Sequence, residues 1–287
     1  MRSAARRHPV LARVIFYAAI LLIAVPAALA YSITRPFRRP AGPPPPGFRE
    51  RFVPSDGLRL RAWTRAGSPS KPTVLIIHGV GDSLESFVDS ASWFHARGHG
   101  VALLDTRGHG GSEGTAITLG AREREDVRAA MDALRPDAPA GFLLLGHSMG
   151  SVAALRAAAD RTDVRAVIVE APYDTLANTI AHHAWLFYRM PRWFPIVPLT
   201  TLFAGWRGGF SPAEVDAVQA ASRCRGALLA IADGGDDRMP EPVVRRVFDA
   251  HPGPKAFWVA PGAPHVGAVL HPDYWPTVER FLRENGL

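Results

Sequence analysis

Residues 146–150 read GHSMG, and they lie between the apolar run FLLL at 142–145 and the alanine-rich stretch SVAALRAAAD at 151–160. This order predicts a short strand that enters a helix. Gly146 and Gly150 suit a sharp strand-to-helix reversal, because neighbouring backbone comes close there and leaves no room for side chains. The pattern indicates that Ser148 is a nucleophile on that turn. The alternative interpretation is that the glycines only separate a strand from a helix and that Ser148 is not a nucleophile.

The rest of the chain alternates short apolar runs with longer amphipathic or alanine-rich stretches. The apolar runs are TVLIIHG (73–79), GVALLDTRG (100–108), FLLLGHS (142–148), VRAVIVEAP (164–172), ALLAIADGG (227–235) and KAFWVAPG (255–262). Apolar strands that alternate with helices predict an α/β fold with a mostly parallel central sheet and helices on both faces. Upstream, RERFVPSDGLRLRAWTRAG (49–67) predicts an antiparallel hairpin at the sheet edge, with its turn at residues 55–57.

The alternation is interrupted between about 173 and 211, where the segment is rich in aromatic residues and prolines and carries no strand signal. We expect a helical cap here, inserted over the carboxyl ends of the strands, where ligands collect in such sheets. Its aromatic side chains suit an apolar acyl or aryl group, or else they pack the cap onto the domain. They are Trp185, Phe187, Tyr188, Trp193, Phe194, Phe203, Trp206 and Phe210.

The net charge of +7 is concentrated near the N-terminus. Residues 1–51 hold nine arginines and one acid, Glu50, whereas residues 52–287 hold 24 basic and 25 acidic residues. The domain is therefore nearly neutral, and the basic surplus fits membrane topology or lipid contact rather than a phosphate-binding face. We expect no nucleic-acid partner. The only cysteine, Cys224, excludes an intramolecular disulfide.

A leader precedes the domain. Residues 14–34 carry no charge and at about 1.5 Å per residue can cross a bilayer, so we predict a transmembrane anchor after a basic segment at 1–13. A cleaved signal peptide is the alternative, because Ala28, Leu29 and Ala30 form a small-x-small site. The arginines before the span favour a cytoplasmic N-terminus and an extracytoplasmic domain, and signal cleavage would instead give a secreted protein. Residues 35–47 predict a stiff proline-rich linker that holds the domain away from the membrane.

Five motifs follow one another along the chain. They are IIHGVGDSLESF (76–87), LLDTRGHGGSEG (103–114), GHSMG (146–150), GGDDRMP (234–240) and APGAPHVGAV (260–269). With these motifs, residues 48–287 resemble the α/β-hydrolase superfamily, and more closely the bacterial membrane-anchored serine hydrolases of the BEM46-like and serine-aminopeptidase-like (S33-type) group. The resemblance implies the α/β-hydrolase fold and a catalytic triad in the chain order Ser, Asp, His.

The resemblance also implies a role for particular residues. Ser148 would be the nucleophile, and His265, in the loop before the terminal helix, would be its base. The acid that orients His265 should follow the strand at 227–233. We select Asp237, which precedes the short stretch RMP, and keep Asp236 as the alternative because this segment is one residue shorter than the common spacing. Backbone N–H groups of Val80 and Met149 would form the oxyanion hole.

The predicted activity is hydrolysis of carboxylic esters, with lipid-like esters or thioesters included, through an acyl-enzyme. A peptidase or an envelope acyltransferase would use the same triad, and a catalytically silent membrane-tethered binding scaffold is an alternative from another class. No Walker loop, GxGxxG or zinc-type cluster occurs in the sequence, so we expect no cofactor and no metal. The sequence leaves the acyl chain, the leaving group and the oligomeric state open.

Overall fold

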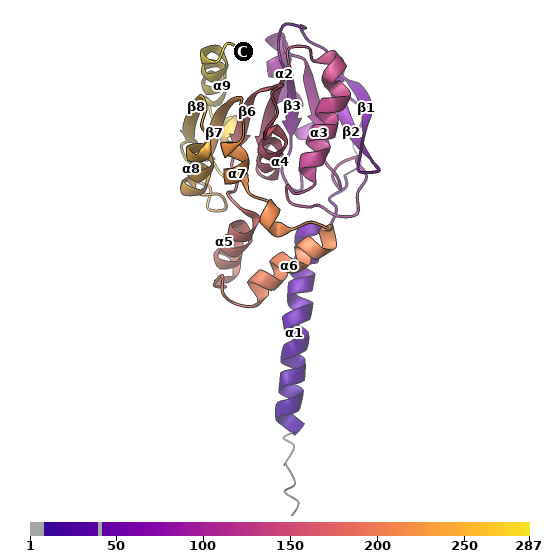
Figure 1. Ribbon diagram of the computed structural model, residues 1–287, viewed down its shortest axis with the longest axis vertical. Coiled ribbons are helices and arrows are strands. Elements are labelled where there is room, and N and C mark those ends of the chain that lie inside the picture. Colours follow the sequence, from indigo (N-terminus) through magenta and orange to yellow (C-terminus); the bar gives the residue numbers. More distant parts are fainter. Residues whose placement is uncertain (1–8, 40–41) are drawn as a thin grey trace, which may run out of the picture.

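The computed structural model describes residues 9–39 and 42–287, and Figure 1 shows a layered α/β domain on a long N-terminal helix. The strands are β1 (Arg49–Ser55), β2 (Leu58–Arg65), β3 (Thr73–Ile77), β4 (Val101–Leu104), β5 (Phe142–His147), β6 (Val164–Glu170), β7 (Ala227–Asp233) and β8 (Lys255–Ala260). The helices are α1 (Pro9–Thr34), α2 (Val88–Ala96), α3 (Glu123–Leu134), α4 (Met149–Ala158), α5 (Leu176–Tyr188), α6 (Ile196–Gly208), α7 (Ala217–Ser222), α8 (Glu241–Ala250) and α9 (Tyr274–Glu284).

The strands form one eight-stranded sheet, within the described residues, in the order β1-β2-β4-β3-β5-β6-β7-β8. Strands β3 to β8 pair in parallel, and β2 pairs antiparallel with β4. The predicted edge hairpin is confirmed, because β1 and β2 pair antiparallel around Asp56 and Gly57. Both turn residues have positive φ, at 47° and 77°, which is the backbone of a tight two-residue hairpin turn.

Helices cover both faces of this sheet, as the apolar strands predict. On one face, the core joins the strands to α3, α4, α7 and α8 through residues such as Met131, Val152 and Val244. On the other face, Phe94 of α2 and Tyr274 and Phe281 of α9 pack on the same strands. Figure 1 shows α3, α4 and α7 together in front of the sheet. The sheet is therefore buried on both sides, and its carboxyl edge remains for a site.

The reversal from β5 into α4 is as tight as the glycine spacing predicts. A Cβ atom on Gly146 would lie 2.5 Å from the carbonyl oxygen of Gly150. A Cβ atom on Gly150 would lie 2.5 Å from the carbonyl oxygen of His78 and closer still to that of Ile77. Helix α4 therefore touches the end of β3 through bare backbone, and any side chain at these two positions would push them apart.

The segment between β6 and β7 is helical, as predicted for residues 173–211. It consists mainly of α5 and α6, which lie beyond the carboxyl edge of the sheet, and α6 packs against α1 (Figure 1). Helix α5 begins with a capping hydrogen bond from the Asn178 backbone N–H to the Thr175 hydroxyl. Helix α6 ends at Gly209, whose φ of 64° suits a glycine cap.

Helix α1 includes the predicted span and is long and apolar enough to cross a membrane over Ala12–Thr34. A signal sequence would pass the same test of length and composition. Of the predicted basic segment at 1–13, residues 1–8 lie outside the described residues, as do residues 40 and 41 of the predicted linker.

The chain that follows α1 lies against the domain, whereas the distance that residues 35–47 would set between the domain and a membrane stays a prediction. Thr34 is fully buried, and its carbonyl oxygen accepts a hydrogen bond from the Ile117 backbone N–H at 2.8 Å. Directly after it, the Phe37 N–H donates to the carbonyl oxygen of Gly108 at 2.7 Å. The chain therefore follows the domain surface as soon as α1 ends. Proline stiffness sets how extended a linker is, but it does not keep the linker from binding a nearby surface.

We expect Gly150→Ala to destabilise the protein, because the added methyl group meets backbone carbonyl oxygens that cannot rotate away. Overpacking of this kind costs about 1–3 kcal/mol. The control is Gly42→Ala, where the added Cβ would meet its nearest heavy atom at an ordinary 3.7 Å. Denaturant unfolding of both variants measures the difference. Equal unfolding midpoints for the two variants would show that α4 can move away from β3 at little cost.

Candidate active site

Ser148 stands at the junction of β5 and α4 with a φ of 51°, a conformation that residues other than glycine seldom adopt. The residues on either side of it are buried, and Ser148 alone in the pentapeptide is partly exposed. Its N–H donates to the carbonyl oxygen of Glu170 on β6 at 2.9 Å, which helps to hold the strained turn. The fold therefore presents one hydroxyl at the carboxyl edge of the sheet.

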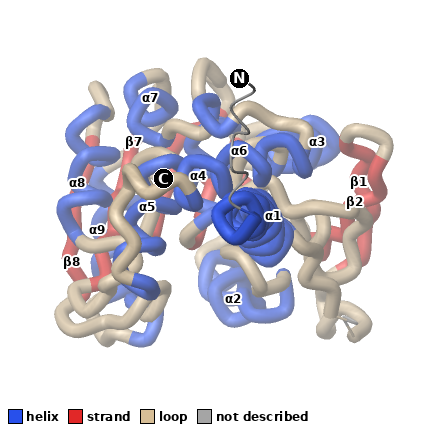
Figure 2. Tube along the Cα trace, turned by 90° about the horizontal axis from the view of Figure 1, so that it is seen from below, coloured by secondary structure: helices blue, strands red, loops and turns tan. Residues whose placement is uncertain are grey.

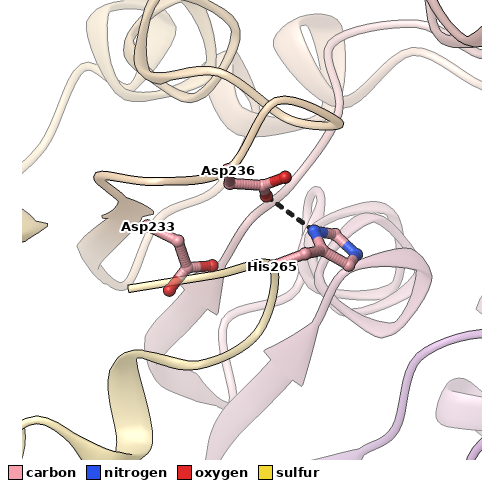
Figure 3. A group of neighbouring side chains, drawn as sticks. All are labelled: Asp233, Asp236 and His265. Atoms are coloured by element: carbon pink, nitrogen blue, oxygen red, sulfur yellow. Dashed lines mark hydrogen bonds and ion pairs between the residues drawn. The ribbon is translucent and has the colours of Figure 1, made fainter. Parts of the chain in front are cut away.

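His265 reaches this hydroxyl from the loop between β8 and α9. Its Nε2 lies 3.0 Å from Ser148 Oγ, and its Nδ1 lies 2.6 Å from Oδ2 of Asp236. A carboxylate can only accept, so Nδ1 carries the proton and Nε2 is the acceptor for the serine hydroxyl. The three side chains form one hydrogen-bonded line from Asp236 through His265 to Ser148, and Figure 3 shows its Asp236–His265 half.

The carboxylate that contacts His265 belongs to Asp236, not to the selected Asp237. A turn in which the Asp236 N–H donates to the carbonyl oxygen of Asp233 directs Asp236 inward, so the next residue points to solvent. Oδ1 of Asp236 also accepts from the backbone N–H groups of Arg238 and Met239 at 2.8 and 3.0 Å. Although burial opposes ionisation, the hydrogen bonds from His265 and these amides lower the pKa of Asp236 below its ordinary value. The hydrogen bond to His265 therefore favours the alternative acid, Asp236, over Asp237.

A second buried carboxylate, Asp233, holds the loop that carries His265. Its two oxygens accept from the backbone N–H groups of Val266 and Ala268 at 2.9 and 3.0 Å. The Ala268 N–H is shared with Glu170, so two carboxylates meet in the interior. Burial, and next the charge of Glu170, raise the pKa of Asp233 to about 8. Asp233 is therefore largely protonated at neutral pH and positions His265 through the backbone.

Asp233, Asp236 and His265 are also the one group in the described part of the chain whose side chains could together hold a metal ion (Figure 3). Their candidate ligand atoms lie within 4.8 Å of one another. Hydrogen bonds already account for these atoms, since Nδ1 of His265 carries a proton toward Asp236 and the oxygens of Asp233 accept from backbone amides. A protonated ring nitrogen cannot bind a metal, so the expectation of no metal stays our prediction.

The backbone of the two expected oxyanion donors lies beside Ser148. Met149 is the first residue of α4, where N–H groups have no partner within the helix. A Cβ atom on Gly79 would lie 3.3 Å from Cβ of Ser148, so the chain leading into Val80 passes directly over the serine. Val80 and Met149 line the same cavity as Ser148. Both residues are therefore placed where an oxyanion could be bound.

This cavity, of about 510 Å³, is lined by Ser148 and His265 and has a volume typical of ligand pockets. Its lining is mostly apolar and comes from three parts of the chain: the end of α1, the loops at the sheet edge, and the helices α5 and α6. Leu29 and Ile33 of α1 belong to it, and no prediction from the sequence included them. Their signal in the sequence was weak, because both are ordinary apolar residues of the expected span.

The two adjacent histidines of α5, His182 and His183, have different surroundings. His182 Nε2 donates to the carbonyl oxygen of Asp237 at 2.7 Å and so ties the cap to the loop that holds Asp236. His183 lines the cavity, and burial lowers its pKa to about 4. The pair does not converge on a common point, so its geometry does not suit a metal site.

Other buried polar groups near the site serve the packing of its loops. His78 Nδ1 donates to the carbonyl oxygen of Gly79 at 2.7 Å, and its Nε2 accepts from the Thr106 N–H at 3.1 Å. Burial lowers the pKa of His109 to about 3. Asp105 accepts from two loop amides, at 2.8 and 2.9 Å. These side chains brace the loops at the ends of the strands.

Comparison with known proteins places this geometry among hydrolases. The model of the family described as serine aminopeptidase, S33, matches residues 68–225, more than half of the chain. The uncharacterized protein YqkD of Bacillus subtilis is 27% identical over 234 residues, which cover 79% of this chain and 76% of YqkD. Mouse monoglyceride lipase is 31% identical over 115 residues, 38% of each chain. A solved esterase of Pyrococcus furiosus has a TM-score of 0.69 at 23% identity and covers 88% of this chain and 98% of its own.

We expect Asp236→Asn to lower kcat on an activated ester by about 10³- to 10⁴-fold, because the amide cannot hold the imidazole in the required tautomer or stabilise its charge. Asp237→Asn is the matched control, since it makes the same change one residue away on an exposed side chain, and we expect it to keep kcat close to that of the parent. Steady-state kinetics of the two variants measure both. A larger loss in Asp237→Asn would return the acid role to Asp237.

The raised pKa of Asp233 predicts a pH dependence of stability. An unfolded Asp titrates near pH 4, whereas folded Asp233 titrates at about pH 8, so its contribution to stability is fully present below about pH 4 and is lost as pH rises through about 8. We therefore expect the unfolding free energy of Asp233→Asn, relative to the parent, to increase between about pH 5 and about pH 9. Urea unfolding across this range tests it. A constant difference would show that Asp233 is ionised in the folded protein throughout.

Proposed function

The chain belongs to the serine aminopeptidase S33 family and is a hydrolase of the α/β-hydrolase superfamily, and we propose that it cleaves carboxylic esters through a covalent acyl-enzyme. The observation that carries the proposal is the hydrogen-bonded line from Asp236 through His265 to Ser148 beside an apolar cavity. A serine hydroxyl is a weak nucleophile, and this arrangement supplies the base and the orienting acid that it needs.

In the acylation step, Ser148 Oγ attacks the carbonyl carbon of the ester while its proton passes to Nε2 of His265. The imidazole then carries a positive charge, and the carboxylate of Asp236 stabilises that charge through the Nδ1 proton. The carbonyl oxygen becomes an oxyanion, for which the backbone N–H groups of Met149 and Val80 are the proposed donors. Loss of one such donor typically costs about 100- to 1,000-fold in rate.

The intermediate collapses when Nε2–H of His265 gives its proton to the leaving alcohol and the ester C–O bond breaks. The acyl group then remains on Ser148 Oγ. Water then attacks the acyl carbon while Nε2 of His265 takes its proton. The bond from the acyl carbon to Ser148 Oγ breaks, His265 returns the proton to Oγ, and the carboxylic acid is released. An alcohol in place of water would make the same step an acyl transfer, so the products formed with a competing alcohol separate a hydrolase from an acyltransferase.

The lining of the cavity favours an ester over a peptide with a free amino terminus. An aminopeptidase must bind the substrate ammonium group, which requires a carboxylate or other acceptors at the site. Among the residues that the structure describes, no Asp or Glu lines this cavity, and the charged side chains that do are Arg35 and Arg238. Two cations would repel an ammonium group. The charge of this pocket therefore does not fit the aminopeptidase activity that the family name describes.

A lipid-like ester is the substrate class that the cavity fits best. Its walls are mainly aliphatic and aromatic, with Ile117, Ile180 and Phe187 among them, and they suit an acyl chain beside Ser148. A relative named monoglyceride lipase supports the same class. Substrate profiling would measure the preferred acyl chain length and the preferred alcohol.

We place the protein in the membrane through α1, with the N-terminus in the cytoplasm and the domain on the extracytoplasmic side. The arginines before the span, read with the positive-inside rule, support this orientation. Retention of α1 is supported by its contacts, since cleavage after Ala30 would remove Leu29 from the cavity wall and expose the buried face of the helix. Detection of the uncleaved N-terminus by mass spectrometry tests retention.

We expect a fluorophosphonate probe to label the full chain at Ser148, and labelling to disappear in Ser148→Ala and in His265→Ala. Loss of the nucleophile should also lower ester turnover by at least roughly 10⁴-fold. Ser222→Ala, which removes an exposed hydroxyl outside the cavity, is the control and should label fully. Peptide mapping identifies the labelled residue. A folded parent that takes up no probe would favour the silent scaffold over the enzyme.

A further inference from the structure

The last turns of α1 pack against the cap helix α6. Pro26, Ala30 and Thr34 are buried and recur every four residues, so they form one face of α1. Small residues on such a face let two helices approach closely. Arg207 of α6 fixes the contact, because its Nε donates to Thr34 Oγ1 at 3.0 Å and its guanidinium lies over the ring of Tyr31. Figure 2, viewed along α1, shows α6 directly beside it.

This docked end of α1 is also a wall of the catalytic cavity. Leu29, Ser32 and Ile33 of α1 line this cavity together with residues of α5 and α6 and with the catalytic side chains of Ser148 and His265. The cavity therefore extends from the catalytic side chains toward the helix that is long enough to cross a membrane (Figure 1). A molecule that moves along α1 out of a bilayer would reach Ser148 without leaving apolar surroundings.

The outer surface of the cap matches a bilayer interface in both apolar character and charge. Seven large apolar side chains are exposed on α5, α6 and the turn between them: Trp185, Phe187, Tyr188, Trp193, Phe194, Leu202 and Trp206. Residues 175–213 contain no carboxylate side chain but do contain Arg189, Arg192 and Arg207. Exposed Trp and Tyr with Arg and no acids are typical of segments that lie in the headgroup region of an anionic membrane.

We propose that α5 and α6 lie in the interface of the same bilayer that α1 crosses, and that the catalytic cavity opens there, so that a bilayer lipid delivers its acyl chain along Leu29 and Ile33. The cap surface is continuous with the apolar surface of α1 through the α1–α6 contact, which is why we assign it to the bilayer rather than to a protein partner. This inference rests on the proposed ester hydrolysis at Ser148 and names the route of its substrate.

The first experiment measures where the cap lies. The full chain is reconstituted into vesicles of phosphatidylcholine and phosphatidylglycerol, and a polarity-sensitive NBD label is attached at Trp193→Cys or Trp206→Cys. The native Cys224 is buried, so the parent serves as the labelling blank. The control is Phe52→Cys, an exposed aromatic position on the edge strand β1, outside the cap. We expect blue-shifted emission and quenching by nitroxide lipids at 193 and 206 but not at 52.

The second experiment measures whether the cap surface delivers substrate. The measured quantity is the turnover of a palmitoyl ester embedded in vesicles divided by the turnover of a soluble butyryl ester. The replacement of Trp193 and Trp206 by Asp should lower this ratio by about tenfold or more, because it removes two side chains that anchor the cap in the interface. The same replacement of Phe52 by Asp should leave this ratio unchanged. Unchanged ratios in both variants, or labels at 193 and 206 that stay in water, would overturn the proposal. Protection of these labels by a second copy of the chain in detergent would assign the surface to a dimer instead.

The third experiment tests α1 as a cavity wall. Ile33→Trp should narrow the cavity and lower the palmitoyl-to-butyryl turnover ratio by about tenfold or more. Ile23→Trp makes the same substitution on an exposed part of the same helix and should leave the ratio unchanged. An unchanged ratio in Ile33→Trp would remove α1 from the substrate route. Failure of the parent to hydrolyse even the soluble butyryl ester would instead refute the proposed function, so the two failures are distinguishable.

Discussion

The structure depends on the contact between the backbone of α4 and the end of β3. Gly150 lies so close to the carbonyl oxygens of Ile77 and His78 that no side chain fits between them. This contact forces the chain to reverse within one residue, and Ser148 takes the strained positive φ that results. Strain at a reactive residue persists only where the surrounding packing over-determines it. The strands and helices around this point fix the serine, and the site is built around it.

Buried carboxylates then set the position of the histidine. Asp236 holds the imidazole directly, while Asp233 holds the backbone on the C-terminal side of His265 and shares an amide with Glu170. The pKa values of Asp236 and Asp233 are shifted in opposite directions. Hydrogen bonds from His265 and two backbone amides lower the pKa of Asp236, whereas burial, and next the charge of Glu170, raise the pKa of Asp233. The segment from Asp233 to Asp236 thus holds one ionised carboxylate, which orients the His265 ring, and one largely protonated carboxyl group, which holds the His265 loop.

The N-terminal helix has a structural role beyond tethering. A single helix in lipid gains little from binding another apolar surface, so its docking on α6 depends on close packing of small residues and on the hydrogen bond from Arg207 to Thr34. Through this contact, a segment that composition identifies only as membrane-like becomes part of the cavity wall. In the aromatic cap beside it, most of the large side chains are exposed, and Phe187 and Tyr188 also line the cavity.

The sequence by itself determined the alternation of strands and helices, the edge hairpin, the helical cap and the pairing of Ser148 with His265. These features follow from local periodicity and from motifs at strand ends, which need no knowledge of distant contacts. Only the tertiary structure decided between Asp236 and Asp237 and docked α1 on the cap. A single turn can direct two adjacent carboxylates to opposite sides, so the local sequence does not show which of them faces His265. Whether a segment binds a surface depends on residues that are distant in the sequence, so the docking of α1 and of the chain after it does not follow from the local pattern either.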